Sequence, residues 1–294
     1  MTIGIIPNTT KVQILEVVEE VIYKINEYSI NYVLSDDLLK LNFAMKPGIK
    51  KSKFLNLKQI ADVADIIISI GGDGTMLTTA YEFREARIPM VGLNLGKLGF
   101  LAEFDMNELD HLLQNIKSGT LIVDERIALE AVSEKTGDEK LFAINDLVID
   151  KGRWPKMITL TLRIDKYDVT TFSADGIIIA TPTGSTGYSL SAGGPIVSPK
   201  SDAITISPIS PHTLTMRPLV ISSSQKILVT VESQYESVQI NCDGQRVHYF
   251  EPPFSIEIYK REKPIRLLHT NKTNYYQILR NKLLWGLDVR NKDK

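Results

Sequence analysis

The chain has 294 residues, 43% hydrophobic and 23% charged, a composition typical of globular proteins. Its formal net charge of −1 excludes a general attraction to nucleic acid or anionic membranes, and its single cysteine, Cys242, excludes intrachain disulfides and cysteine-built metal sites. The start of the sequence has no signal-peptide pattern, and no run of 18 apolar residues occurs. We therefore expect a cytoplasmic protein that binds neither membranes nor nucleic acid.

The first 120 residues alternate between strand and helix patterns. Apolar strands are expected at 3–6, 30–38 and 65–70 and at the start of 88–101. Helices are expected at 10–28, where Val12, Leu15, Val18, Ile22 and Ile25 recur at helical spacing, at 75–85, and at 106–119 with Gly119 near the C-terminal cap. This alternation predicts an α/β domain with a parallel sheet.

The pattern changes after residue 121. Up to about residue 268 the chain is a series of short strand patterns separated by turn residues, which predicts an all-β sandwich. Residues 273–286 are helical again, and Ile278, Leu279, Leu283 and Trp285 require cover from a neighbouring element.

The first candidate for chemistry is Gly71-Gly72-Asp73-Gly74-Thr75, between a buried strand and a helix. Glycines allow the main chain to approach phosphate oxygens, and a helix N-terminus adds partial positive charge. The motif is neither a dinucleotide fingerprint nor a P-loop, because no lysine follows the glycines. The alternative is a left-handed turn in which Asp73 or Thr75 caps the helix.

The second candidate is TPTGSTGYSLSAGGP (181–195), which follows Asp175-Gly176 and a buried strand. This loop is dense in hydroxyl side chains and glycines, so ordering it without a ligand is expensive. The hydroxyls suit a purine edge and a ribose, and Tyr188 offers a stacking face. A plain polar loop is the alternative.

Four further stretches are more ambiguous. GLNLGKLGFL (92–101) is equally explained by turn chemistry, and the basic KPGIKKSK (46–53) is better explained as a solvated loop than as an anion contact. Asn145-Asp146 interrupts an apolar strand, so this pair belongs either to a structural network or to a ligand site. NCDGQRV (241–247) is best explained as a hairpin turn through Asp243-Gly244, with Gln245 as an additional candidate contact.

The sequence disfavours nucleophilic catalysis and metal binding by protein side chains. The four histidines are scattered, and no Gly-x-Ser-x-Gly elbow occurs. Phosphoryl transfer fits better, because it requires positioning, a metal ion and one carboxylate that accepts the hydroxyl proton.

Together, these motifs resemble the NAD kinases of the bacterial ATP- or polyphosphate-dependent type, from the first strand to about residue 265. The resemblance rests on Gly71–Thr75, GLNLGKLGFL, Asn145-Asp146, Asp175-Gly176, the 181–195 loop, SPISPHTLTMRPLV and CDGQ. It implies an α/β domain of residues 1–120, to which 268–294 return, and a β-sandwich of residues 121–267 that binds NAD. It also implies a homodimer or homotetramer and the substrates NAD and ATP, the latter bound with Mg²⁺.

The resemblance assigns roles to individual residues. Asp73 matches the proton acceptor for the 2′-hydroxyl of the adenosine ribose of NAD. The positions that match nucleotide contacts are Gly71, Gly72, Asp73, Gly74, Thr75, Asn145, Asp146, Lys156, Asp175, Thr183, Thr186, Gly187, Tyr188, Ser189, Leu190, Ser191, Ser210 and Gln245.

Three positions depart from the family pattern. Ser173 stands where arginine is frequent, Lys156 where some relatives have histidine, and Gly187 where alanine is usual. Ser173 and Lys156 affect how NAD is discriminated from NADH, or product from substrate, rather than the reaction type, and Gly187 slightly loosens the loop. Two alternatives remain: a kinase of the same superfamily acting on a lipid or sugar hydroxyl, which the hydrophilic 181–195 loop disfavours, and an NAD(H)-binding sensor without activity.

Overall fold

The structure is a computed structural model that describes residues 1–41, 43, 49–96, 99–270 and 274–285. Part of the basic stretch (46–48) and Lys97 and Leu98 of the 92–101 motif therefore lie outside the described residues. The chain divides into two compact units, one of residues 1–124 and 266–294 and one of residues 125–265.

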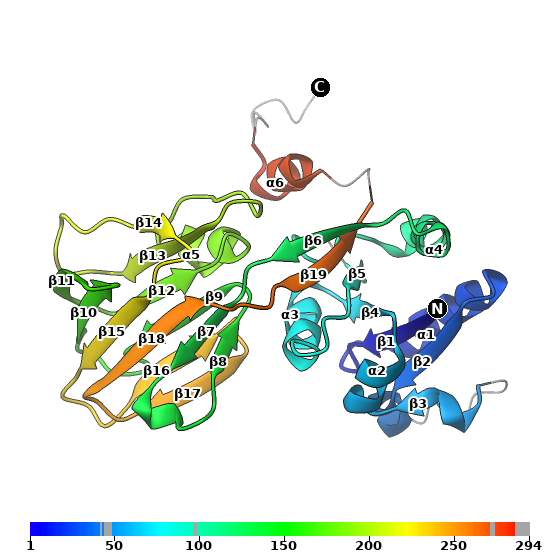
Figure 1. Ribbon diagram of the computed structural model, residues 1–294, viewed down its shortest axis with the longest axis horizontal. Helices are drawn as coiled ribbons and strands as arrows, with labels where there is room; N and C mark the ends of the chain where they lie inside the picture. The colour runs from blue at the N-terminus through cyan, green and yellow to red at the C-terminus, as the bar shows by residue number, and fades with distance from the viewer. Residues whose placement is uncertain (42, 44–48, 97–98, 271–273, 286–294) are drawn as a thin grey trace. The chain divides into compact units, whose positions relative to one another are not determined.

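The first unit contains a seven-stranded sheet in the described part of the chain, in the order β3-β2-β1-β4-β5-β19-β6. Neighbouring strands from β3 to β19 pair in parallel (Figure 1). The strands are β1 (Thr2–Pro7), β2 (Asn31–Ser35), β3 (Phe54–Leu55), β4 (Ile66–Gly71), β5 (Met90–Asn94), β6 (Ile122–Arg126) and β19 (Ile265–His269). The predicted α/β domain with a parallel sheet is confirmed.

Helices cover both faces of this sheet. Its helices are α1 (Ile14–Glu27), α2 (Leu57–Val63), α3 (Asp73–Glu82), α4 (Leu109–Ser118) and α6 (Tyr275–Leu283). The apolar faces of α1 and α4 share one core with Ile5 and Ile68. On the other face, Gly4 lies against Ile60 of α2, and Gly92 lies against Met76 of α3. The sheet is thus covered on both faces, which explains the uniformly apolar β4.

The second unit is an antiparallel sandwich. Its two six-stranded sheets have the orders β11-β10-β15-β18-β7-β8 and β14-β13-β12-β9-β16-β17 among the described residues. Leu160, Val229 and Ile256 of one sheet share a core with Ile179 and Ile240 of the other, so the predicted sandwich is confirmed. The first sheet's strands are β7 (Leu129–Val132), β8 (Leu141–Ala143), β10 (Ile158–Ile164), β11 (Tyr167–Ala174), β15 (Ile227–Glu232) and β18 (Phe254–Lys260). The second has β9 (Asp146–Asp150), β12 (Gly176–Ala180), β13 (Ala203–Ile209), β14 (Leu219–Ser222), β16 (Val238–Cys242) and β17 (Arg246–Phe250).

The elements differ from the sequence-based expectations in several places. Helix α1 begins at Ile14 rather than at residue 10, and Val12 is 99% exposed. Helix α3 begins at Asp73, two residues before the expected start, so the Gly-Gly-Asp-Gly-Thr motif contains the first helical turn. The loop 181–195 contains a short 3₁₀ turn (Gly184–Thr186) and a short helix α5 (Tyr188–Ser191) that the sequence did not indicate, because glycine and serine are weak helix formers.

The C-terminal segment belongs to the first unit. Strand β19 joins the sheet beside β5, and Lys282 of α6 lies 5.7 Å from the ring centre of Phe100. Ile278 and Leu279 of α6 are buried as expected, whereas Trp285 is 52% exposed. The predicted return of the C-terminal helix to the first domain is confirmed, but the sequence did not indicate β19.

Candidate active site

The Gly-Gly-Asp-Gly-Thr motif lies at the carboxyl end of β4, where α3 begins. None of its described glycines adopts a positive φ, so the left-handed turn considered from the sequence is absent here. The Thr75 hydroxyl accepts the Gly72 N–H at 3.4 Å and the Asn8 amide N–H at 3.1 Å. A Cβ on Gly71 would lie 2.1 Å from that hydroxyl oxygen, so residue 71 is glycine because the chain and Thr75 approach closely. Thr75 therefore does contribute to the helix start, as the capping interpretation supposed.

Asp73 does not cap the helix. Its carboxylate accepts backbone N–H bonds from Phe100 at 2.8 Å and from Leu101 and Ala102 at 3.0 Å each. A Cβ on Gly99 would lie 1.8 Å from Asp73 Oδ1, which explains that glycine in the 92–101 motif. The two glycine-rich motifs of the first unit thus form one structure around a single carboxylate.

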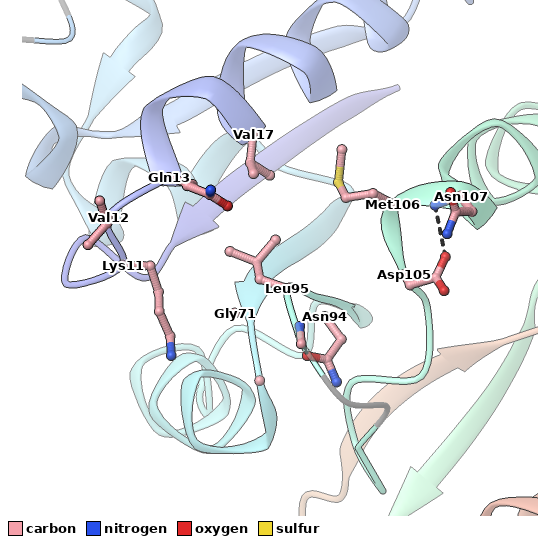
Figure 2. A pocket seen from close by; sticks show the side chains of 12 residues that line it. Lys11, Val12, Gln13, Val17, Gly71, Asn94, Leu95, Asp105, Met106 and Asn107 are labelled. Carbon is pink, nitrogen blue, oxygen red and sulfur yellow. Dashed lines mark hydrogen bonds between the residues drawn. The ribbon is translucent and has the colours of Figure 1, made fainter.

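A pocket of about 730 Å³ opens beside this carboxyl end of the sheet. Figure 2 shows residues from the segment after β1, from the end of β5 and from the segment before α4 arranged around Gly71. Ligands of open α/β sheets bind at this edge, where strands end and helices begin. Among the described lining residues, Lys11 is the only cation, and it forms no ion pair with another described residue. The lining residues are Lys11, Val12, Gln13, Val17, Gly71, Gly72, Asn94, Leu95, Gly96, Asp105, Met106 and Asn107.

In the second unit, Asn145 and Asp146 form a corner between β8 and β9, next to the turn after β12. Thr181 donates its backbone N–H to Asn145 O at 2.9 Å, and a Cβ on Gly187 would lie 3.6 Å from an Asp146 carboxyl oxygen. The structure therefore brings this corner and the 181–191 segment together, although they are about 40 residues apart in sequence.

The side chains of the corner carry unused polar groups. Asn145 Oδ1 is buried without a hydrogen-bond partner among the described residues. Asp146 is 6% exposed, and burial, with a smaller contribution from the charge of Asp243, raises its pKa to about 7. Buried polar groups in proteins are normally paired. The partnerless Asn145 Oδ1 and the buried Asp146 carboxyl, which forms no hydrogen bond with another described side chain, favour the ligand-site interpretation of Asn145-Asp146 over a purely structural network.

The hydroxyls of the 181–195 loop divide into two groups. Ser185 is fully buried and bonds Pro182 O and Val197, and the Ser189 hydroxyl shares a 2.9 Å bond with Ser207. These hydroxyls hold the loop, so the Ser189 side chain is not directed to open space. Tyr188, by contrast, is 48% exposed. Gly187 and Ser191 are exposed, and Thr186 and Leu190 are half-buried.

The remaining sequence-based candidates lie at strand ends of the second unit. Asp175, just before β12, forms a 2.6 Å ion pair with Lys151, a cation that the sequence did not single out. Lys156 is exposed, and its Nζ lies 3.4 Å from Gln234. Ser210 is exposed after β13, with a φ of 45°. Gln245 is exposed in the turn between β16 and β17.

Two buried residues near these candidates, Arg126 and Asp243, were not predicted from the sequence to belong to the site. Arg126 is 4% exposed and donates to the Thr183 hydroxyl at 3.3 Å. Asp243 was interpreted only as a turn residue. Its φ of 57° and that of Gly244, 68°, confirm the turn, but its carboxylate also bonds the Asn145-Asp146 corner. No sequence signal distinguishes such a carboxylate from an ordinary Asp-Gly turn.

No cluster of three His, Cys, Asp or Glu side chains suited to a metal ion occurs within the described ranges. Burial raises the pKa of the Cys242 thiol to about 12, so this cysteine is not a nucleophile. In the part of the chain that the structure describes, no helix is long and apolar enough to cross a membrane.

Sequence comparison decides the family. Residues 3–121 match the model of the ATP-NAD kinase N-terminal domain, and residues 144–270 match that of the ATP-NAD kinase C-terminal domain. The chain belongs to the NAD kinase family. The NAD kinase of Prosthecochloris aestuarii is 39% identical over 287 residues, covering 97% of this chain and 98% of that protein. The NAD kinase of Chlorobium phaeobacteroides strain BS1 is 38% identical over 293 residues, with the same coverage.

Solved structures of NAD kinases share this fold. Yeast NADH kinase complexed with NADH superposes with a TM-score of 0.86 at 29% identity, over 97% of this chain and 87% of that one. An NAD kinase from Archaeoglobus fulgidus in complex with ATP gives a TM-score of 0.75 at 25% identity, over 97% and 99%. The family resemblance of the sequence motifs is thereby confirmed.

Proposed function

We propose that this chain is an NAD kinase that transfers the γ-phosphoryl group of ATP to the 2′-hydroxyl of the adenosine ribose of NAD, which yields NADP. The observation that carries the proposal is that both ATP-NAD kinase domains match in order, with Asp73 at the carboxyl end of β4. The hydrophilic 181–191 segment and its buried hydroxyls speak against a lipid acceptor.

The phosphate donor is proposed to bind in the pocket beside Gly71 and Gly72. Backbone N–H groups at the start of α3 and the Lys11 ammonium supply positive charge for a triphosphate. Asp73 is the only carboxylate of the motif, and the described residues lack a three-ligand metal cluster, so Mg²⁺ is proposed to enter on the phosphates of ATP. Bound there, the ion neutralises charge on the transferring group.

NAD is proposed to bind the candidate residues of the second unit. Asn145 Oδ1 accepts from a ligand N–H, the Asp146 carboxyl and the Tyr188 hydroxyl offer further hydrogen bonds, and the exposed Tyr188 ring offers a stacking face. The other proposed contacts are Lys156, Asp175, Thr183, Thr186, Gly187, Ser189, Leu190, Ser191, Ser210 and Gln245; Ser189 contributes its backbone, because its hydroxyl is bonded to Ser207.

Asp73 is proposed to accept the ribose proton. In the structure its carboxylate is held by three N–H groups, which fixes its orientation at the end of β4. General-base assistance contributes typically about 10²–10⁴-fold, so most of the rate must come from aligning the hydroxyl and stabilising the phosphoryl charge.

The direct test is an assay of purified protein with MgATP and NAD that measures NADP. NADP formation is expected; NAD binding without turnover would support an inactive sensor instead. Parallel reactions with polyphosphate in place of ATP, and with NADH in place of NAD, define the donor and the acceptor. The NADH reaction is included because the yeast structure with a TM-score of 0.86 is an NADH kinase.

The role of Asp73 is tested by Asp73→Asn. This variant keeps the side-chain shape and one oxygen that accepts N–H bonds, but it cannot accept a proton. We expect kcat to fall at least about 10²-fold while NAD binding, measured by calorimetry, persists. Turnover equal to that of the parent chain would remove the assigned role.

Three further features are proposed from family membership and composition. The domain boundaries near residues 120 and 267, a cytoplasmic location, and a homodimer or homotetramer are expected for this chain. The oligomer is proposed because the resemblance of the sequence motifs to the NAD kinases implies it.

A further inference from the structure

The Asn145-Asp146 corner is held by a carboxylate that lies about 100 residues further along the chain. Asp243 Oδ1 accepts the backbone N–H of Asn145 at 2.7 Å and of Ile144 at 2.9 Å, and the N–H of Asp146 lies 3.3 Å away. Asp243 Oδ2 lies 3.1 Å from the Ile144 nitrogen. One side chain thus binds three consecutive backbone N–H groups of the corner.

The Asp243 carboxylate is buried, and its negative charge is paired with Arg246. The residue is 7% exposed, and Arg246 Nη2 donates to its Oδ2 at 2.8 Å and to Phe142 O at 3.1 Å. Burial raises the pKa of Asp243, and the N–H groups and Arg246 oppose that rise. Both oxygens act as acceptors, which fits the unprotonated carboxylate. Burying a charge is costly unless it is paired in this way.

The backbone carbonyls of the corner are hydrogen-bonded by Thr181, the residue directly after β12. The Thr181 N–H donates to Asn145 O, the Thr181 hydroxyl donates to Ile144 O, and a Cβ on Gly184 would lie 2.0 Å from Asn145 O. Because the corner's main-chain groups are satisfied by Asp243 and Thr181, its side chains are not needed to satisfy them. Asn145 Oδ1, which has no hydrogen-bond partner among the described residues, and the buried Asp146 carboxyl are the groups left for a ligand.

The turn by itself does not require this arrangement. An Asp-Gly or Asn-Gly pair with two positive φ angles forms such a hairpin equally well. Asp165, in the turn between β10 and β11, also has a positive φ, 52°, and its carboxylate accepts the Lys226 N–H at 3.0 Å. Asp165 has an exposed carboxylate, however, and its partners Lys226 and Gln225 are not among the candidate nucleotide contacts. The two aspartates share the positive φ of a turn residue, but only the Asp243 carboxylate bonds the backbone of a candidate nucleotide-binding segment.

We propose that Asp243 is a positioning residue for NAD: it does not touch the reacting atoms, but it fixes the backbone from which Asn145 and Asp146 contact the nucleotide. The inference rests on the proposed function, because it assigns NAD to this corner. Removing the carboxylate leaves three backbone N–H groups without their acceptor, and these groups then compete with the nucleotide for the Asn145 and Asp146 side chains.

The experiment compares Asp243→Ala and Asp243→Asn with the matched control Asp165→Ala in the full chain. Steady-state kinetics give kcat and the KM values for NAD and ATP, calorimetry gives direct NAD affinity, and thermal melting followed by circular dichroism reports folding. We expect Asp243→Ala to raise the KM and Kd for NAD about tenfold or more, with the KM for ATP unchanged and kcat altered less than about threefold. Asp243→Asn keeps one acceptor oxygen, so it should lie between Asp243→Ala and the parent chain.

The outcomes separate the two proposals. Parent protein that forms no NADP would overturn the proposed function. Active parent protein together with folded Asp243 variants whose NAD affinity matches that of Asp165→Ala would overturn the positioning role. An equal loss of NAD and ATP affinity would also overturn it, because that is the result of general destabilisation. If Asp243→Ala does not fold, Asp243→Asn carries the same comparison.

Discussion

Asp146 is a buried carboxyl whose ionisation is coupled to folding. Burial is the larger and the Asp243 charge the smaller reason that its pKa is about 7 in the folded chain, above its usual value of about 4. When the pKa of a carboxyl is higher in the folded chain than in the unfolded chain, its neutral form favours the folded state. This contribution is fully present at pH values below the unfolded-state pKa. That contribution is lost as the pH rises through about 7, because the folded chain must then hold a buried charge.

This coupling predicts the pH dependence of the Asp146→Asn variant. Without nucleotide, the free energy of unfolding of the parent chain should fall relative to that of Asp146→Asn by about 2–3 kcal/mol between pH 5 and pH 8, as a three-unit pKa shift implies. Urea unfolding at both pH values measures the difference, and the exposed Asp138→Asn serves as control. If the free energy of unfolding changed equally with pH in the parent chain and in Asp146→Asn, the raised pKa of Asp146 would be contradicted.

Single residues also show which part of the site was accessible from sequence. Asp73, Asn145 and Asp146 were identified because a carboxylate among glycines and a polar pair in an apolar strand are local anomalies. Lys11, Lys151 and Asp243 were not, because a lysine outside any motif and an Asp-Gly turn are common in any protein. Their importance comes from partners that the local sequence does not show.

At the scale of elements, the α3 start and the segment after β5 form one structure. Asp73 begins α3, and the residues that hold its carboxylate follow 27 to 29 positions later. Helical periodicity predicted α4 well, including Gly119 in the left-handed conformation with a φ of 68°. It could not predict α5 or β19, since α5 is only four residues long and half serine, and β19 is a five-residue strand without alternation.

The contact between these elements predicts the effect of Gly99→Ala. The added methyl would lie 1.8 Å from Asp73 Oδ1, so the carboxylate or the 100–102 backbone must move. We expect kcat to fall at least about tenfold, because displacing a reacting group by a fraction of an ångström to one ångström costs up to about 10²-fold.

A double-mutant cycle provides the control for that substitution. In the Asp73→Ala background the methyl meets no carboxylate, so Gly99→Ala should cost less stability there than in the parent chain. Melting temperatures of the four proteins measure this coupling. Additive losses would show that the methyl acts through some contact other than Asp73.

At the scale of the whole molecule, the chain leaves its first unit near residue 124 and returns near residue 265. The switch from alternating strand and helix patterns to strands alone marks the first crossing in the sequence. The second crossing has a weaker signal, because β18 and β19 are both short strands although they belong to different sheets.

Assembly is the prediction that belongs to this scale. If the chain forms the homodimer or homotetramer expected of the family, light scattering should give a mass of two or four times the 33.0 kDa of one chain. The measurement is made at several protein concentrations with and without NAD. A mass of one chain under all conditions would contradict the proposed oligomer.

The sequence by itself determined the family, the class of each unit and the position of the glycine-rich and hydroxyl-rich motifs. These depend on local order along the chain: periodicity, turn residues and short motifs. Only the tertiary structure decided that Asp73 is held by residues 100–102, that the Ser189 hydroxyl is bonded to Ser207, and that Asp243 holds the Asn145-Asp146 corner. Such pairs join atoms far apart in the chain, and a hydrogen bond depends on distances and angles that exist only after the strands have been brought together.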